Sequence, residues 1–374
     1  MGNRKRKRFV ILIEDDFEIL GNGLGNVAHL QYLPALFLMN TAEEFGVKIT
    51  FMVDVAHQLA LSRYQQKNPN LRIQKNLWDE TVRMMKERGF DVQLHVHSQW
   101  IDPVYEDGHF KLNRNWNIGC CKPSEQKQIL SDSIKYLKCI LQPIDPDYQV
   151  IAFKAGSWGL QPSFPLLQEL KNAGIRIVMG VRDSLRVHSA SIDYTGLEEK
   201  YLPYHPLLTD VTKVSLERNG LVVIPLQPYA PDLLTLLRLS CRVAVNKIRY
   251  KTRLPYYYEQ PIPKQARRTS SFTWSNDFRF SIRPYLTHLK IGKQPFFYLK
   301  ASFDAVLRRL RDYDIERIPI VIESHTKQYH NAYGGIKRFI GYIAERYEDE
   351  VEFKDITSYL KEIDEDLDLV TLRK

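Results

Sequence analysis

Three consecutive carboxylates, Glu14, Asp15 and Asp16, follow directly on a run of five apolar residues, Phe9–Ile13. Such a run predicts a buried strand, and adjacent like charges at its end repel one another. A bound cation relieves this repulsion. When two adjacent carboxylates lie beside an ion, one can bind the metal while the other accepts a proton from metal-bound water. The stretch therefore predicts a metal site with a general base next to it.

Two histidines, His95 and His97, occupy alternate positions at the end of another apolar segment, 90–96. Residues i and i+2 of a strand point to the same face, so both imidazoles can reach one ion. Two imidazoles, one carboxylate and an open position form the usual ligand set of a catalytic zinc or iron site. Together with the acidic run, the histidine pair predicts a site for a divalent ion.

Further polar and aromatic residues follow other apolar runs. Lys154 is expected to pair with the carboxylate that acts as the base and to hold it ionised. His325, across the predicted barrel, is expected to act as a general acid. Trp100, Trp158 and Tyr229 are candidates for stacking on a sugar ring, with the alternative that they are core aromatic residues.

The elements that must position these residues alternate along the chain. Short apolar runs predict strands at 8–13, 47–53, 90–96, 148–155, 175–181, 220–226 and 317–324. Segments with helical periodicity lie at 27–46, 77–89, 124–141, 163–174, 303–314, 336–349 and 355–364. This alternation predicts an α/β fold of parallel strands covered by helices, and seven strands favour one barrel-like sheet. In such folds the chemistry lies at the carboxyl ends of the strands, where the residues above are found.

Composition narrows the class of protein further. The chain has 374 residues, of which 44% are hydrophobic and 26% charged, as in a globular protein with a sizeable core. No G-x-G-x-x-G motif follows the first strand, because "GNGLGN" at 21–26 comes too late and is typical of a turn-rich loop. Dinucleotide binding is therefore not expected.

Much of the net charge of +9 lies in one stretch, 238–268, which contains nine Lys and Arg residues against the single acid Glu259. The preceding segment, 231–248, has the pattern of an amphipathic helix. The stretch predicts contact with a membrane surface or an anionic carrier, with a solvated helix and basic loop as the alternative. No nucleic-acid-binding motif accompanies the charge, so a nucleic-acid partner is not expected.

The four cysteines form no C-x-x-C pair, which favours reduced thiols in the cytosol over a zinc–cysteine site. The basic N-terminus is followed by too short an apolar run for a signal peptide, and no run of 18 apolar residues occurs. We therefore expect a cytoplasmic protein, with the basic stretch as its means of lying against a membrane.

Taken in chain order, these motifs resemble those of the polysaccharide deacetylase superfamily, carbohydrate esterases with a distorted seven-stranded barrel. The matching segments are the acidic run, "DVQLHVHSQW" at 91–100, "FKAGSWGLQP" at 153–162 and "ESHTK" at 323–327, and the resemblance covers roughly residues 8–330. It implies that Asp15 is the catalytic base, that Asp16 and His95 bind the metal, and that His325 is the late catalytic histidine. Lys154 stands where the family has an arginine that orients the base.

Two positions depart from the family pattern. The second metal-binding histidine of the family would fall at position 99, which is Gln99 here, so His97 must complete the site. Lysine in place of the arginine at position 154 keeps the charge but loses the planar fork of hydrogen-bond donors.

The resemblance implies a distorted (β/α)7 barrel, and we expect it to form one catalytic domain over 1–374 with a basic insertion at about 230–298. The expected function is a metal-dependent deacetylase or amidohydrolase, with zinc as the expected ion. Its substrate is expected to be an N-acylated sugar on a nucleotide- or lipid-linked glycan precursor. One alternative is a non-catalytic carbohydrate-binding protein on the same barrel, which Gln99 and Lys154 favour. The other is a glycosidase using two carboxylates among Glu14, Asp15 and Glu323.

Overall fold

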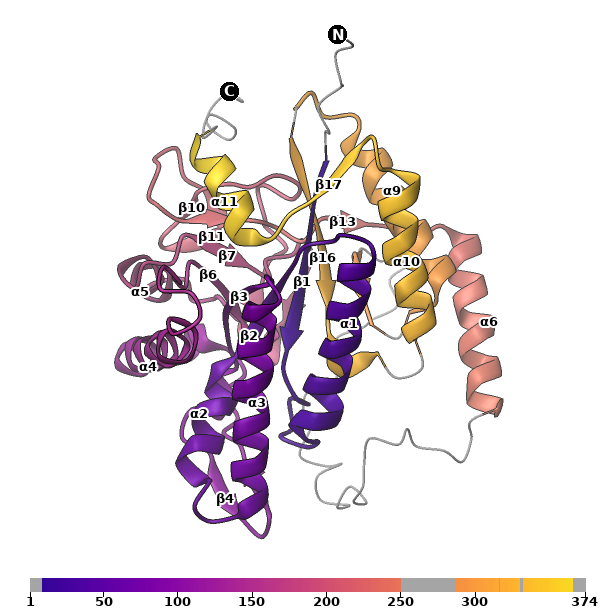
Figure 1. Cartoon of the computed structure of the whole chain (residues 1–374). Coiled ribbons are helices and arrows are strands. Elements are labelled where there is room, and N and C mark those ends of the chain that lie inside the picture. Colours follow the sequence, from indigo (N-terminus) through magenta and orange to yellow (C-terminus); the bar gives the residue numbers. More distant parts are fainter. Residues whose placement is uncertain (1–8, 250–286, 293, 316, 330–331, 366–374) are drawn as a thin grey trace.

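A curled sheet of parallel strands forms the centre of the molecule, and helices surround it (Figure 1). The computed structural model describes residues 9–249, 287–292, 294–315, 317–329 and 332–365. The strand order is β12-β7-β6-β3-β2-β1-β16-β15, every neighbouring pair is parallel, and β17 pairs with the start of β1. The predicted α/β fold with a barrel-like, mostly parallel sheet is confirmed.

The strands of this sheet are β1 (Phe9–Phe17), β2 (Ile49–Asp54), β3 (Asp91–Val96), β6 (Ala152–Ala155), β7 (Ile177–Met179), β12 (Val222–Val223), β15 (Lys290–Ile291), β16 (Ile318–Ser324) and β17 (Val351–Phe353). All seven predicted strands are present. The sequence patterns missed β15 and β17, which are too short to show a period of two. The predictions also ended the first strand too early, because β1 continues through the acidic run to Phe17.

Four small antiparallel pairs decorate the loops. They are β4 (Val104–Glu106) with β5 (His109–Lys111), β8 (Arg186–Val187) with β9 (Ile192–Asp193), β10 (Pro206–Leu207) with β11 (Asp210–Val214), and β13 (Pro228–Tyr229) with β14 (Thr287–His288). The last pair brings a segment before the basic stretch next to one after it.

The helices are α1 (Leu33–Glu44), preceded by a π-helical turn at Ala28–Tyr32, α2 (Val55–Tyr64), α3 (Pro69–Glu87), α4 (Pro123–Leu141), α5 (Leu166–Asn172), α6 (Leu233–Arg249), α9 (Phe296–Leu310), α10 (Tyr333–Arg346) and α11 (Ile356–Glu365). Only α2, which follows β2 without a loop, was not predicted. The predicted amphipathic helix is α6. Residues 250–286 of the predicted basic insertion lie outside the described part of the chain.

Both faces of β1 are buried, as in other parallel sheets covered by helices. Phe9, Ile11 and Ile13 belong to the apolar cluster that includes the surrounding helices. Val10 and Leu12 belong to the inner cluster, with residues of the other strands. Because side chains alternate along a strand, this division also decides the face on which each acid of β1 lies.

The open side of the sheet is bridged by one amide side chain. Gln227 donates a hydrogen bond to the carbonyl oxygen of Pro319 (3.0 Å) and accepts one from the backbone N–H of Val321 (3.0 Å). These are bonds that a neighbouring strand would make with β16. In the described residues, the amide thus links the chain after β12 to the far end of the sheet.

Candidate metal and catalytic site

Glu14, Asp16 and Glu18 lie on the inner face of the sheet. Glu14 and Asp16 continue the alternation that places Val10 and Leu12 in the inner cluster, Glu18 follows one residue after the end of β1, and all three carboxylates are buried. Glu18 was not predicted as a site residue. Extending the period of two by one step along "IEDDFE" would have found it.

Asp15 points to the opposite face, toward the surrounding helices. Its Oδ1 accepts a hydrogen bond from the backbone N–H of Thr326 at 3.1 Å. Burial raises the pKa of Asp15 to about 7, against hydrogen bonds from Ser324 and Thr326 that lower it. The expected pairing of Asp15 with Lys154 is wrong, because the two side chains lie on different faces of the sheet.

Lys154, at the end of β6, instead contacts three carboxylates of the inner face. Its Nζ lies 2.7 Å from Glu14, 2.7 Å from Asp16 and 2.9 Å from Glu323. Burial lowers the pKa of Lys154, but these carboxylates outweigh burial and raise it well above its usual value. Burial also raises the pKa of Glu14 well above its usual range, which favours its protonated form. The ammonium charge is then shared by Asp16 and Glu323.

His95 and His97 both face Glu18. Their rings are perpendicular, with centroids 4.8 Å apart. Oε2 of Glu18 contacts Nε2 of His97 and lies 3.8 Å from Nε2 of His95. The other carboxylate oxygen, Oε1, is bound by the ammonium of Lys327 at 2.7 Å. The potential ligand atoms of Glu18, His95 and His97 all lie within 4.8 Å of one another.

The hydrogen bonds behind the two rings suit metal binding. Nδ1 of His95 lies 2.9 Å from the carbonyl oxygen of Lys154, so it carries the proton and leaves the Nε2 lone pair facing Glu18. Nδ1 of His97 lies 3.2 Å from Oε1 of Gln99. Within the described residues, both Nε2 atoms and Oε2 of Glu18 are buried without a hydrogen-bond partner. Three such acceptor atoms fit a divalent cation of the zinc or iron type.

The electrostatics point the same way. Although burial opposes it, the negative charges of Asp16 and Glu18 raise the pKa of His95 to about 9. This position therefore favours positive charge. Gln99 is not part of the group of Glu18, His95 and His97. Its side-chain amide lies within hydrogen-bond distance of Nδ1 of His97. His97 lies with His95 and Glu18 in the group whose potential ligand atoms are close together.

A second group, formed by Asp16, Glu323 and His325, also has its potential ligand atoms within 4.8 Å. It is a poor cation site because the ammonium of Lys154 already neutralises both carboxylates. Lys290 adds a second ammonium, 3.4 Å from Glu323. Asp16 therefore groups with His325 and Lys154, and Glu18 takes the place that was predicted for Asp16 beside the histidines.

His325 lies between an acid and a base. Its Nε2 is 3.3 Å from Oδ2 of Asp16 and 3.4 Å from Nζ of Lys290. Burial, together with the charge of Lys290, lowers the pKa of His325 to about 3. The imidazole is therefore neutral at neutral pH.

The three predicted aromatic contacts differ in their surroundings. Trp100 packs in the core against His57, with ring centroids 4.7 Å apart. The hydroxyl of Tyr229, also in the core, is 2.6 Å from that of Ser302. Neither buried ring can stack on a sugar. Trp158 is only partly buried, and its Nε1 donates a hydrogen bond to Glu323 at 2.9 Å, so it borders the site.

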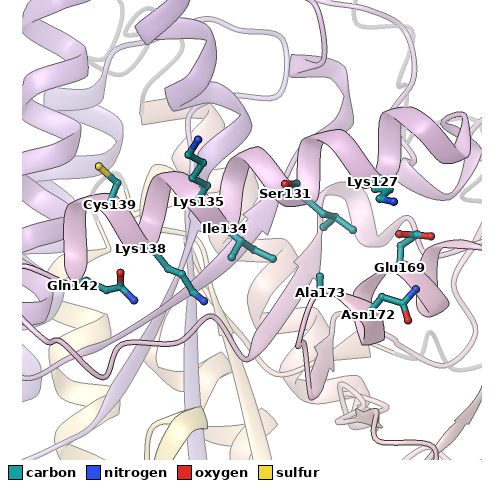
Figure 2. A pocket seen from close by; sticks show the side chains of 11 residues that line it. Lys127, Ser131, Ile134, Lys135, Lys138, Cys139, Gln142, Glu169, Asn172 and Ala173 are labelled. Carbon is teal, nitrogen blue, oxygen red and sulfur yellow. The ribbon is translucent and has the colours of Figure 1, made fainter.

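A hollow of about 600 Å³ lies elsewhere, between α4 and α5. Figure 2 shows side chains of its walls, with Lys135 and Lys138 from α4 and Glu169 and Asn172 from α5. None of the residues described above lines it. The catalytic chemistry is therefore to be sought at the strand ends and not in this hollow.

No family model and no curated protein matches the sequence, but solved structures do. A candidate polysaccharide deacetylase from Mycobacterium smegmatis matches with a TM-score of 0.52 and 12% identity, over 100% of this chain and 96% of the other. A candidate glycoside hydrolase/deacetylase from Parabacteroides distasonis matches with a TM-score of 0.54 and 10% identity, over 95% of this chain and 71% of the other. At these identities the likeness is one of fold. The chain has the curled α/β barrel of polysaccharide deacetylase structures.

Proposed function

We propose that the chain is a single catalytic domain that hydrolyses the amide bond of an N-acylated sugar with the help of a divalent metal ion. The observation that carries the proposal is the group of Glu18, His95 and His97 next to the Asp16–Lys154 ion pair. Its position at the carboxyl ends of parallel strands is where α/β barrels place their chemistry.

Glu18, His95 and His97 would hold the ion. Their two nitrogen atoms and one oxygen atom match catalytic zinc sites, which keep one position open. When bound, the ion polarises the acyl carbonyl and makes a water molecule more acidic. Lys327 supports this arrangement, because its hydrogen bond to Oε1 of Glu18 directs the other oxygen toward the histidines.

Asp16 is the proposed general base. Burial opposes its ionisation, but the charge of Lys154 outweighs burial and lowers the pKa of Asp16, so the carboxylate is ionised and ready to accept a proton. This role moves from Asp15 to Asp16 because Asp15 faces the helices. Lys154 keeps its expected role of holding the base ionised, but it acts on Asp16.

His325 is the proposed general acid. The 3.3 Å contact between its Nε2 and Oδ2 of Asp16 offers a direct route for the proton taken from water. From His325 the proton can pass to the departing amine nitrogen. Lys290, 3.4 Å from the same Nε2, favours release of that proton because its positive charge lowers the pKa of His325.

We also propose that the enzyme works in the cytoplasm and against a membrane surface, where lipid-linked glycan precursors are available. Four leucines at the start of α6 are strongly exposed: Leu233 by 73%, Leu234 by 59%, Leu236 by 36% and Leu237 by 54%. Arg238 beside them is exposed too, and no acid occurs from 233 to 258. Exposed leucines that lead into a stretch of positive charge suit an anionic lipid surface. No described helix is long and apolar enough to cross a membrane.

The proposed activity is tested on the purified full chain. Bound metal is measured by mass spectrometry, and acetate release is measured on a panel of N-acetylated sugars with and without a chelator. The proposal expects one ion per chain and acetate release that stops on chelation and returns with zinc. Sugar binding without acetate release, unchanged by chelation, would favour a non-catalytic binding protein. Cleavage of chromogenic glycosides would favour a glycosidase.

A further inference from the structure

Arg182 is a nearly buried cation for which the described residues supply no counter-charge. It lies just beyond the end of β7, where its backbone forms a bridge with Leu226, and the residue is only 8% exposed. Its guanidinium makes no ion pair and no hydrogen bond with any residue in the described part of the chain. Its guanidinium carbon lies 5.6 Å from the centroid of the Trp158 ring. A buried, unpaired charge normally destabilises a fold.

Two arginines that are more exposed than Arg182 are nevertheless paired. Arg88 binds Glu43 at 2.6 Å, and Arg311 binds Glu350 at 2.6 Å. Asp183 is next to Arg182 in the sequence, but it binds Lys200 at 3.0 Å instead. The positive charge of Arg182 is therefore not balanced by Asp183, although Asp183 is its neighbour in the sequence.

Arg182 lies beside the proposed catalytic residues. Trp158, the ring that it contacts, donates a hydrogen bond to Glu323, which also binds Lys154. A second cation, Lys290, lies 5.7 Å from the centroid of the Trp158 ring. Two positive groups thus flank one partly exposed indole at the edge of the site.

The charge of Arg182 also acts on a neighbouring histidine, His288. His288 is hydrogen-bonded to Glu323 at 2.7 Å, which by itself would raise its pKa. Burial nevertheless lowers the pKa of His288 to about 4, and the charges of Arg182 and Lys290 act in the same direction. The charges of Arg182 and Lys290 therefore both reach the position of His288.

We propose that Arg182, together with Lys290, binds an anionic group of the substrate, a carboxylate or a phosphate, beside the ring of Trp158. The planar guanidinium offers paired N–H donors that match a carboxylate or a phosphate. Hydrogen bonds between these charged groups are stronger where water is excluded. This inference rests on the proposed function and narrows its substrate class to N-acylated sugars that are acidic or phosphorylated. A neutral N-acylated sugar would leave Arg182 unpaired in the complex.

The test compares binding of three sugars by titration calorimetry: N-acetylglucosamine, N-acetylglucosamine 1-phosphate and N-acetylmuramic acid. The wild-type protein is expected to bind one or both anionic sugars more tightly than the neutral one. N-acetylglucosamine 1-phosphate tests recognition of a phosphate, and N-acetylmuramic acid tests recognition of a carboxylate. Arg182→Met should weaken binding of the preferred anionic sugar about 10- to 100-fold. The affinity for the neutral sugar should stay the same. Arg182→Lys should recover part of the loss. The matched control is Arg186→Met, which removes an exposed arginine paired with Asp193.

A stability measurement separates binding from a purely structural role. If Arg182 serves the ligand, Arg182→Met removes an unpaired buried charge and the urea midpoint should stay the same or rise. A lower midpoint would show that Arg182 supports the fold and would overturn the inference. Equal affinity of the wild type for all three sugars, or no effect of Arg182→Met, would overturn it as well.

Failure of the proposed function looks different. If anionic sugars bind through Arg182 but no acetate is released from any of them, the anion site stands and the hydrolase proposal falls. If acetate is released at the same rate from neutral and anionic sugars, and Arg182→Met changes neither, the hydrolase stands and the anion site falls.

Discussion

The ammonium of Lys154 lies 2.7 Å from the carboxylate of Asp16 and not against Asp15, the neighbouring acid in the sequence. The two acids differ only in the face of β1 on which they lie. One joins the buried charges of the inner face, and the other accepts a hydrogen bond from Thr326 on the outer face. This single relationship changes the assignment of the general base.

The pair Asp16→Asn and Asp15→Asn tests that assignment. We expect Asp16→Asn to lower kcat by about 10²- to 10⁴-fold, the range for loss of a general base. Asp15→Asn should keep most of the activity, because burial raises the pKa of Asp15 to about 7 and a neutral side chain is tolerated there. Acetate release by the two variants, each checked by circular dichroism, gives the answer. The reverse order of activities would return the role to Asp15.

Glu18→Gln is expected to weaken metal binding by at least about 10-fold, because it removes the charged ligand that faces both histidines. Competition with a fluorescent zinc chelator measures the affinity directly and does not depend on finding the substrate. Glu80→Gln, on an exposed position of α3, is the matched control and should bind zinc as the wild type does. Zinc affinity that is unchanged in Glu18→Gln would exclude the triad.

Lys154→Met should be strongly destabilising. It leaves Asp16 and Glu323 buried without their counter-charge, and breaking a buried ion pair in this way costs about 3–5 kcal/mol. Urea unfolding measures the loss. Lys111→Met removes the exposed partner of Glu106 and should change the midpoint little. A small effect of Lys154→Met would mean that the carboxylates take up protons when the lysine is lost, and unfolding at higher pH would then reveal the missing charge.

Stability should fall in mild acid partly because of His57. Burial lowers the pKa of this histidine from its usual 6.5 to about 3, so the unfolded chain takes up a proton below pH 6.5 while the folded chain does not. The contribution of His57 to the free energy of unfolding is complete above pH 6.5. It is lost as the pH falls toward 3, by up to about 1.4 kcal/mol per pH unit. His57→Phe keeps a ring against Trp100 and should show a shallower loss between pH 6.5 and 5. The exposed His109, changed to Gln, should leave the slope as in the wild type.

Replacing Leu234 and Leu237 of α6 by serine should abolish binding to vesicles that contain a fifth of anionic phosphatidylglycerol. Both side chains are more than half exposed, so the fold should tolerate the change. Cosedimentation measures binding, and vesicles of neutral phosphatidylcholine should not bind even the wild type strongly. Serine at the exposed Leu207 and Leu216 is the control. If vesicle binding depends on salt but persists in the α6 variant, the membrane contact lies elsewhere on the protein. If light scattering shows dimers, the exposed leucines of α6 contact a second copy of the protein.

Much of this fold follows from local patterns. Apolar runs and helical periodicity were enough to predict seven strands of the main sheet and most helices, because each element must bury its own apolar face. The same reasoning brought His95, His97, Lys154 and His325 to one edge of the sheet, since the carboxyl ends of parallel strands meet there. The types of residue at that edge were enough to predict a metal site.

The tertiary structure alone showed on which face of the sheet each of these acids lies. Side chains alternate along a strand, so an error of one residue exchanges the inner face for the outer one. The sequence shows three adjacent acids, but only the length and register of β1 reveal that Glu14 and Asp16 share the inner face, and only tertiary contacts bring Glu18 to the histidines. Contacts between distant segments, such as Lys154 with Glu323 or Arg182 with Trp158, leave no local pattern at all, because they arise only when the sheet curls and brings its strand ends together.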